Sequence, residues 1–325
     1  MNVQTLAVNS STHRPHRLHA SSRTWPQSNC YIDLWIELLH AAGHEPAAAL
    51  PMTVMQDFEG DQFTFFKFPA EDLEVLFGVV VQELAIYDAL DVHILEQLRR
   101  GRPVLVEVDG FNLPDTHGTS YRREHVKTTI GAAALDLEAS RLGYFHNAGY
   151  YVLEGEDFEG VFRRPSMGGA GHLFPYAEFV KLEGGLTLPA DTLLKGSLTL
   201  LRKHLGRRPK TNPIGSYRTE LGSHLTRLAA RPLAYFHVYS FNTLRQLGAN
   251  FGLLGSYVEW LEGQGESHLG EVRDACEQLA ADCKALQFQL ARAVNRRSFG
   301  DYEVIFERLE AAYDTALTGL VARYG

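Results

Sequence analysis

The sequence predicts an α+β domain followed by an all-helical domain, and three observations support this fold class. The chain has 325 residues, roughly twice the length of a typical domain. Short β-type runs alternate with short helical runs up to a Gly/Pro-rich stretch at 163–175, and beyond it almost every segment has helical periodicity. We therefore expect a loose N-terminal segment at 1–24, an α+β domain at 25–185 and a helical bundle at 186–325.

Composition narrows the classes of protein to which this chain can belong. Apolar residues make up 45% of the chain and charged residues 22%, which excludes a disordered protein. The net charge of −8 argues against a nucleic-acid binder that uses its whole surface, although it leaves a local basic patch open. No window reaches the ~18 apolar residues of a membrane span, and the first residues lack the apolar core of a signal peptide. We expect a cytoplasmic protein with no membrane or nucleic-acid partner.

The first domain is predicted to contain one buried helix and then a mostly antiparallel sheet. The helix spans 29–40, where Ser28 or Asn29 can cap it and apolar residues surround most of its cylinder. Short β-type runs separated by Gly, Pro and Asp lie at 61–68, 79–86, 103–109, 125–131, 143–147 and 150–155. Short helices are expected at 71–78, 90–101 and 156–164.

The second domain is predicted to be a bundle of long amphipathic helices. Their apolar residues recur at helical spacing, and short Gly- or Pro-containing segments separate them. The expected helices lie near 190–205, 214–229, 233–262, 267–296 and 301–323.

Cys30 stands at the first turn of the predicted buried helix, where a thiol can become reactive. The free N–H groups and the dipole of a helix start favour the thiolate, which is the nucleophilic form. The Cys30 N–H could also hold an oxyanion, together with a side chain of Gln27, Ser28 or Asn29. The alternative is a structural thiol, because free cysteine is among the most buried residue types.

A thiolate nucleophile needs a base, and His125 is the first candidate. It opens a β-type run directly after a polar loop, and His117 in that loop is the competitor. His146 and Asn147 close the next strand, so Asn147 can lie beside His125 and fix its tautomer. The expected catalytic set is Cys30, His125 and Asn147, and the alternative for each histidine is a solvated or structural role.

The order of these residues resembles that of papain-like folds: Cys at a helix start, His opening a strand, and Asn or Asp ending the next strand. The segments GRPVLVEVDGFNLPDT, REHVKTTIG and RLGYFHNAGYYVLEGEDFEGVFRR are similar to the N-terminal domain of the butirosin biosynthesis protein H family. That family is related to the bacteriocin-processing cysteine peptidases. FEGDQFTFFKF resembles the strand after the Cys helix there, and FNTLRQLGANFGLLGSYVEWLE resembles the companion helical domain. The chain is also similar to an uncharacterised bacterial family encoded near nonribosomal peptide synthetases.

This resemblance implies a papain-like cysteine acyltransferase of specialised-metabolite biosynthesis. In that family a Cys–His pair moves an aminoacyl group from the thioester of a carrier protein onto a small-molecule amine. Carried over, Cys30 is the nucleophile, His125 the base and then the acid, and Asn147 the orienting residue. The sequence departs from the pattern at two positions: Asn147 stands where relatives often have Asp, and Thr24 stands where papain-like enzymes have an oxyanion Gln.

Two alternatives to the acyltransferase remain at this point. The same residues could serve a cysteine hydrolase, such as an amidase, peptidase or thioesterase, because the chemistry is shared. The chain could also be a non-catalytic module that binds a carrier protein or a metabolite.

Several other polar residues are weaker candidates for substrate binding. His117, Tyr121, Arg122 and Arg123 lie in the loop 115–123, where they could bind a carboxylate or the phosphate of a phosphopantetheine arm, or simply lie in solvent. Asn242 and Arg245 could face the cleft between the domains. The basic linker 206–210 could meet an acidic carrier protein, or be a solvated loop.

Small residues in the helical half are expected to serve packing. Gly248, Gly252 and Gly255 allow a helix to pack closely, and we expect the first domain to be their partner; the alternative is a helix that lines the substrate site. Cys276 and Cys283 are predicted on one face of one helix about 10 Å apart, which is too far for a disulfide or a shared metal. We interpret them as core or surface thiols.

No metal and no cofactor are expected. His13, His16 and His19 have a spacing that could hold a metal, but a loose tail without supporting residues rarely does so. The sequence has no glycine-rich phosphate loop and no dinucleotide fingerprint.

Overall fold

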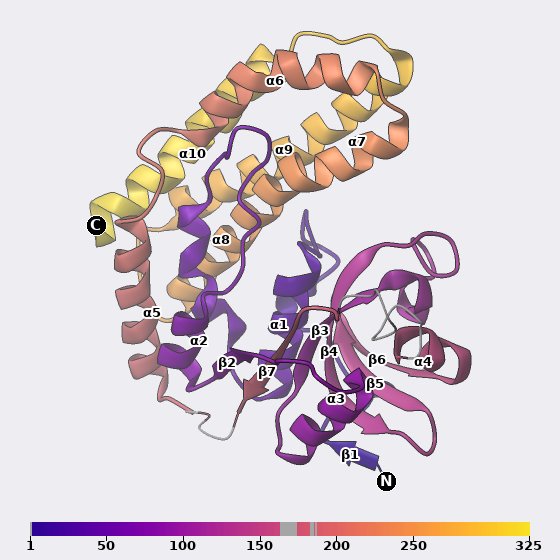
Figure 1. The fold of residues 1–325 in the computed structure, drawn as a ribbon. Helices are drawn as coiled ribbons and strands as arrows, with labels where there is room; N and C mark the ends of the chain where they lie inside the picture. The colour runs from indigo at the N-terminus through magenta and orange to yellow at the C-terminus, as the bar shows by residue number, and fades with distance from the viewer. Residues whose placement is uncertain (1, 163–173, 183–184, 186) are drawn as a thin grey trace. The chain divides into compact units, whose positions relative to one another are not determined.

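A computed structural model describes residues 2–162, 174–182, 185 and 187–325 (Figure 1). Its contacts divide the chain into two compact units. The first unit comprises Met1–Arg17, Asn29–Pro46 and Ala70–Thr187, and the second comprises Leu18–Ser28, Ala47–Pro69 and Leu188–Gly325. The expected boundary lay at 185–186, and most of the Gly/Pro-rich stretch at 163–175 lies outside the described residues.

The first unit is built on one antiparallel sheet, as the sequence predicted. Among the described residues its strand order is β2-β7-β3-β4-β5-β6, and β1 also pairs with β4. The strands are β1 (Asn2–Gln4), β2 (Val80–Glu83), β3 (Val104–Asp109), β4 (Lys127–Asp136), β5 (Arg141–His146), β6 (Gly149–Glu154) and β7 (Ala177–Lys181). Five of the expected β-type runs are therefore strands, whereas β1 and β7 were not predicted.

Helices cover both faces of this sheet. Val104, Val106 and Val108 point to one face, where they share a core with α3 (Leu90–Arg99) and α4 (Gly155–Phe162). Leu105 points to the other face, because side chains alternate along a strand. There a leucine methyl of α1 (Cys30–Ala41) lies 3.5 Å from the place where Gly131 would carry a Cβ. The sheet is thus the middle of three layers.

The predicted buried helix at 29–40 is confirmed as α1. Asn29 caps it, because its side-chain oxygen accepts a hydrogen bond of 3.0 Å from the N–H of Ile32. Trp35 and the isoleucines and leucines of α1 are fully buried, and so is Glu37.

The segment before Trp25, which was expected to be loose, contacts the first unit at two places. β1 pairs with the far end of β4. The buried carboxylate of Glu37 accepts the backbone N–H of His16 at 2.9 Å, and its second oxygen lies 2.7 Å from Nε2 of His13. A buried carboxylate needs such partners.

The second unit contains the predicted helices. They are α5 (Ala190–Leu205), α6 (Pro213–Ala229), α7 (Leu233–Ser240), α8 (Gln246–Gly263), α9 (Gly270–Arg296) and α10 (Glu303–Tyr324). The run expected as one helix at 233–262 is divided by a π-helical turn at Phe241–Arg245. The unit also includes a 3-10 helix at Pro46–Met55, and α2 (Ala70–Phe77) of the first unit follows it along the chain. None of the helices in the described parts of the chain is long and apolar enough to cross a membrane.

The strand predicted at 61–68 is wrong. This segment makes a single isolated bridge, between Phe58 and Phe63, and packs in the helical unit. The rings of Phe58 and Phe63 lie 5.3 and 5.5 Å from the ring of Tyr217, and the N–H of Phe63 donates to the carbonyl of Asn242 in the π-helical turn. The alternating aromatic residues therefore bury against helices instead of against neighbouring strands.

The glycines of α8 pack against α9 in the same unit, and this corrects the expectation that they face the first domain. A Cβ on Gly248 would lie 2.8 Å from the Cβ of Cys283, and one on Gly255 would lie 3.3 Å from the Cβ of Cys276. Gly248 and Gly255 are seven residues apart on α8, and Cys276 and Cys283 are seven residues apart on α9. The contacts pair them in reverse order, so the two helices are antiparallel. Cys276 and Cys283 are core residues, and their small size lets the helices approach closely.

This contact predicts opposite effects for two glycine substitutions in α8. Gly248→Ala should lower the free energy of unfolding by about 1–3 kcal/mol, because its Cβ would lie 2.7 Å from the indole nitrogen of Trp25. That indole cannot easily move, since it donates to the carbonyl of Ala280 at 2.9 Å. Gly252→Ala should be neutral or stabilise by up to about 1 kcal/mol, because its nearest atoms lie at 3.6 Å or more. Chemical denaturation of both variants measures the difference, and equal stabilities would contradict this packing.

Candidate active site

The candidate site begins where β3 ends and β4 starts. In the antiparallel pair Asp109 lies opposite Lys127, so the two strand ends meet at one rim of the sheet. The N–H of Gly110 donates to the carbonyl of Val126 at 2.8 Å, which closes the long loop between the strands. A Cβ on Gly110 would lie 2.9 Å from the Ser120 hydroxyl, so a larger residue here would displace that hydroxyl.

His125 and Asp109 form a polar pair at this rim. The Nδ1 atom of His125 lies 2.7 Å from Oδ2 of Asp109, and the other carboxylate oxygen accepts the N–H of Phe111 at 3.0 Å. The imidazole stacks on the Phe111 ring, with centroids 4.6 Å apart and an 18° interplanar angle. An ionised carboxylate only accepts hydrogen bonds, so Nδ1 carries the proton. Nε2 has no partner among the described residues and can act as a base.

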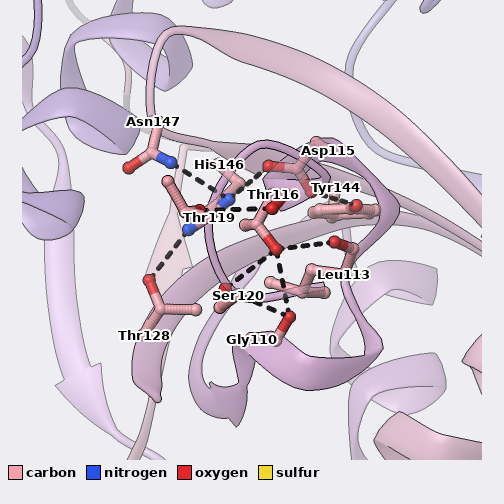
Figure 2. Close-up of polar contacts among 10 residues, drawn as sticks. All are labelled: Gly110, Leu113, Asp115, Thr116, Thr119, Ser120, Thr128, Tyr144, His146 and Asn147. Atoms are coloured by element: carbon pink, nitrogen blue, oxygen red, sulfur yellow. Dashed lines mark hydrogen bonds and ion pairs between the residues drawn. The ribbon is translucent and has the colours of Figure 1, made fainter. Parts of the chain in front are cut away.

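A second histidine pair lies buried beneath the same loop (Figure 2). His146 Nδ1 lies 2.6 Å from Oδ2 of Asp115, and its Nε2 lies 2.8 Å from the Thr128 hydroxyl. The Tyr144 hydroxyl donates to the other oxygen of Asp115 at 2.5 Å. Burial, with Asp115 beside it, raises the pKa of Tyr144 well above its usual value, so the hydroxyl stays a donor. The side chains of His146 and Asp115 are each 2% exposed, so this network is structural.

The loop between β3 and β4 adds its own polar contacts, which Figure 2 also shows. The Thr116 hydroxyl lies 2.9 Å from the carbonyl oxygen of Leu113 and 3.1 Å from that of Gly110. The Ser120 hydroxyl in turn donates to the Thr116 hydroxyl at 2.9 Å. Together with the 3-10 helices at Gly110–Asn112 and Pro114–Thr116, these bonds give a long loop a defined course. They therefore stabilise the loop that begins after Asp109 and ends at His125.

The side chain that contacts His125 is that of Asp109, and Asn147 lies beside His146 instead. Asn147 lies in the tight turn between β5 and β6, with a positive φ of 47°, and its amide lies 3.3 Å from Nδ1 of His146. An Asn147–His125 hydrogen bond does not occur among the residues that the structure describes. The sequence could have indicated Asp109. This residue ends one predicted strand and His125 precedes the next, and two consecutive antiparallel strands bring such ends together.

Cys30 is the first residue of α1 and is partly exposed. Its N–H belongs to the first turn, where N–H groups have no acceptor within the helix. Its sulfur makes no hydrogen bond to His125 or to any other described residue. The other two thiols are fully buried, and burial raises the pKa of Cys276 and of Cys283 far above the usual thiol range. Cys30 is therefore the accessible thiol of this chain.

The residues considered for the oxyanion have other contacts. The side-chain oxygen of Asn29 caps α1. The carbonyl oxygens of Gln27 and Ser28 accept hydrogen bonds from the Arg245 guanidinium, at 3.3 and 3.0 Å, in the second unit. Arg245 thus holds the chain just before α1. Asn242 donates to the carbonyl of Val238 within its own helix.

The loop residues considered for substrate binding divide into two groups. Arg122 and Tyr121 both bind Asp157, with contacts of 2.6 and 3.0 Å. The Arg122 guanidinium also lies 5.6 Å from the centre of the Phe111 ring on which His125 stacks, so it supports the rim. His117 makes an edge contact to the Tyr121 ring, and Arg123 is exposed. The described residues contain no group of three or more His, Cys, Asp or Glu side chains arranged to hold a metal ion.

The chain belongs to the DUF1839 family. The model of the DUF1839 N-terminal domain matches residues 14–182, and that of the DUF1839 C-terminal domain matches residues 190–322. The two matches correspond to the α+β and helical parts of the chain. No curated protein is significantly similar to it.

The buried network predicts that Asp115→Asn destabilises the first unit. The change leaves His146 and Tyr144 without a charged acceptor in a buried place, so we expect a loss of about 3 kcal/mol in the free energy of unfolding. Hydrogen exchange in the loop 110–126 should also become faster. Glu156→Gln is the matched control, because this carboxylate is 95% exposed and lies 3.9 Å from Arg122. It should change stability by less than about 0.5 kcal/mol. Asp115→Asn with the stability and exchange of the wild type would show that the network does not hold the loop.

Proposed function

We propose that the protein is a cysteine-nucleophile acyltransferase, in which Cys30 attacks a thioester and His125 transfers the proton. The observation that carries the proposal is the 2.7 Å contact between Nδ1 of His125 and Asp109, which leaves Nε2 available on a side chain that is 66% exposed. A histidine held by a carboxylate through one nitrogen is the arrangement that general bases use. Asp109 replaces Asn147 as the orienting residue.

The proposed first step makes an acyl-enzyme. The Cys30 thiol gives its proton to Nε2 of His125, and the sulfur forms a bond to the carbonyl carbon of the thioester. The N–H of Cys30 is positioned at a helix start to stabilise the oxyanion. The bond to the donor sulfur then breaks, and the imidazolium returns the proton to that sulfur.

The second step transfers the acyl group. An amine attacks the Cys30 thioester, loses a proton to Nε2 of His125, and the bond to Cys30 breaks. The Cys30 sulfur recovers the proton from the imidazolium, so the enzyme is restored. Water in place of the amine gives a hydrolase with the same residues, and the choice between transfer and hydrolysis depends on water exclusion.

A papain-like arrangement of the first unit is part of this proposal. Two observations support it: the helix that begins with Cys30 covers one face of an antiparallel sheet, and His125 precedes a strand of that sheet. The proposed donor is an acyl or peptidyl carrier protein with a phosphopantetheine arm, and the proposed acceptor is a small amine. A reducing compartment such as the cytoplasm suits this chemistry, because the nucleophile must remain a thiol.

Thiol alkylation tests the nucleophile and its base. Iodoacetamide at pH 6.5–7 should modify Cys30 while Cys276 and Cys283 stay unmodified, because the buried thiols have raised pKa values and no access. His125→Ala and Asp109→Asn should each slow the modification of Cys30 about ten-fold. Peptide mass spectrometry over time measures the rate at each cysteine.

The control for this experiment is His117→Ala. His117 lies in the same loop but has neither Asp109 nor a strand end as its neighbour, so its removal should leave the rate unchanged. If His125→Ala reacts as fast as the wild type, His125 is not the base, and the non-catalytic binding module becomes the better interpretation.

An acyl-enzyme experiment distinguishes transfer from hydrolysis. Incubation with an aminoacyl-S-pantetheine thioester should add one acyl group to the Cys30 peptide, and Cys30→Ala should abolish the addition. A primary amine should then remove the group as an amide faster than buffer alone removes it as an acid. Equal amounts of acid with and without the amine would identify a hydrolase instead.

A further inference from the structure

Helix α7 has apolar side chains on several sides, yet most of them are exposed. Val238 is 61% exposed, and Leu233 and Tyr235 are each 39% exposed. Phe288 on α9 adds a fourth large apolar side chain, which is 60% exposed. Single exposed apolar residues are common, but several on neighbouring helices usually mark an interaction site.

These two helices are next to each other in the second unit. α7 contacts α9, and the Gln287 amide, one residue before Phe288, donates to the Ser240 hydroxyl at the end of α7 at 3.4 Å. In Figure 1 the end of α6, the start of α7 and the end of α9 lie at the same end of the helical unit. The exposed apolar residues therefore lie on two neighbouring helices.

The charge of this region is opposite to that of the whole chain. The chain has a net charge of −8, but the stretches 221–258 and 283–300 contain no Asp or Glu. They contribute exposed arginines at the ends of α6 and α9 and before α7, namely Arg227, Arg231, Arg292, Arg296 and Arg297. None of these five forms an ion pair with a described residue, whereas Arg218 nearby on α6 binds Glu303 and Glu310.

We infer that this α7–α9 surface, made of Leu233, Tyr235, Val238 and Phe288 with these five arginines, docks an acidic helical partner protein. Carboxylates of the partner would pair with the arginine guanidinium groups, which offer two parallel donors each. The apolar face of the partner helix would cover the exposed side chains of α7 and α9. The inference does not depend on the proposed chemistry at Cys30.

Two other occupants fit the observations less well. A two-fold dimer of this chain would bring the same arginines against one another, and like charges at an interface are costly. An anionic bilayer would meet the net negative charge of the whole chain. A partner the size of one helix meets the local charge instead, because charges further away than about 8 Å are screened at physiological salt.

A defined peptide tests the inference with the full-length protein. The probe is a fluorescein-labelled synthetic amphipathic helix with glutamates on one face and leucines on the other, and fluorescence anisotropy measures its dissociation constant. We expect saturable binding below about 1 mM, no binding of the same peptide with lysines in place of the glutamates, and weakening when salt is raised. The double variant Arg231→Glu/Arg292→Glu should weaken binding at least about ten-fold, and Val238→Ser should weaken it as well.

Arg207→Glu is the matched control. Arg207 is an exposed arginine in the basic linker at 206–210, outside the α7–α9 surface, so this change should alter the dissociation constant less than about two-fold. Equal weakening by Arg207→Glu would mean non-specific attraction and would overturn the inference. Absence of binding at 1 mM peptide would also overturn it.

Two further measurements exclude the other occupants. Preferential binding to phosphatidylcholine–phosphatidylglycerol vesicles, lost in the double variant, would assign the surface to a membrane. A mass in light scattering that rises with protein concentration, and that returns to the monomer in the double variant, would assign it to a second copy of the chain. Either result would overturn the proposed partner.

Discussion

The buried carboxylate of Asp115 is the interaction on which the rim of the sheet depends. It accepts hydrogen bonds from His146 on β5 and from the Tyr144 hydroxyl, although it lies outside the sheet, in a short 3-10 helix of the loop between β3 and β4. A buried charge is stable only when such partners are complete, so the loop has one favourable position against β5. The same loop begins at Asp109 and ends at His125, and fixing its middle therefore helps to fix both of its ends.

The two His–Asp pairs of this unit have similar geometry and different roles. Their contacts are 2.6 and 2.7 Å long, yet His146 is 2% exposed and has both ring nitrogens occupied, whereas His125 is 66% exposed and uses one. A ring with both nitrogens bonded can hold a loop but cannot accept another proton without losing a contact. Exposure and the state of the second nitrogen, and not the carboxylate contact itself, make His125 the base in our proposal.

The sequence predicted most elements because hydrophobic periodicity reports burial on one side of an element. It predicted α1 from apolar residues around most of its cylinder and α9 from its amphipathic pattern, and both are confirmed. It failed at 61–68, because alternating aromatic residues indicate only that one side is buried and not what buries it. It also named Asn147 as the orienting residue and did not consider Asp109, since the strand order and the family resemblance said nothing of the loop that joins β3 to β4. That loop determines which strand ends meet.

The three cysteines show why residue type alone could not assign the site. Cys276 and Cys283 face glycines of α8, where a small apolar side chain is what the close approach of two helices requires. Their burial also makes the thiolate unfavourable, so the packing that explains them removes them from chemistry. The small size of Cys30 is not required for packing, because larger apolar residues later in α1 pack this helix against the sheet. A partly exposed thiol at the start of an otherwise buried helix is therefore the one to which our proposal assigns the chemistry.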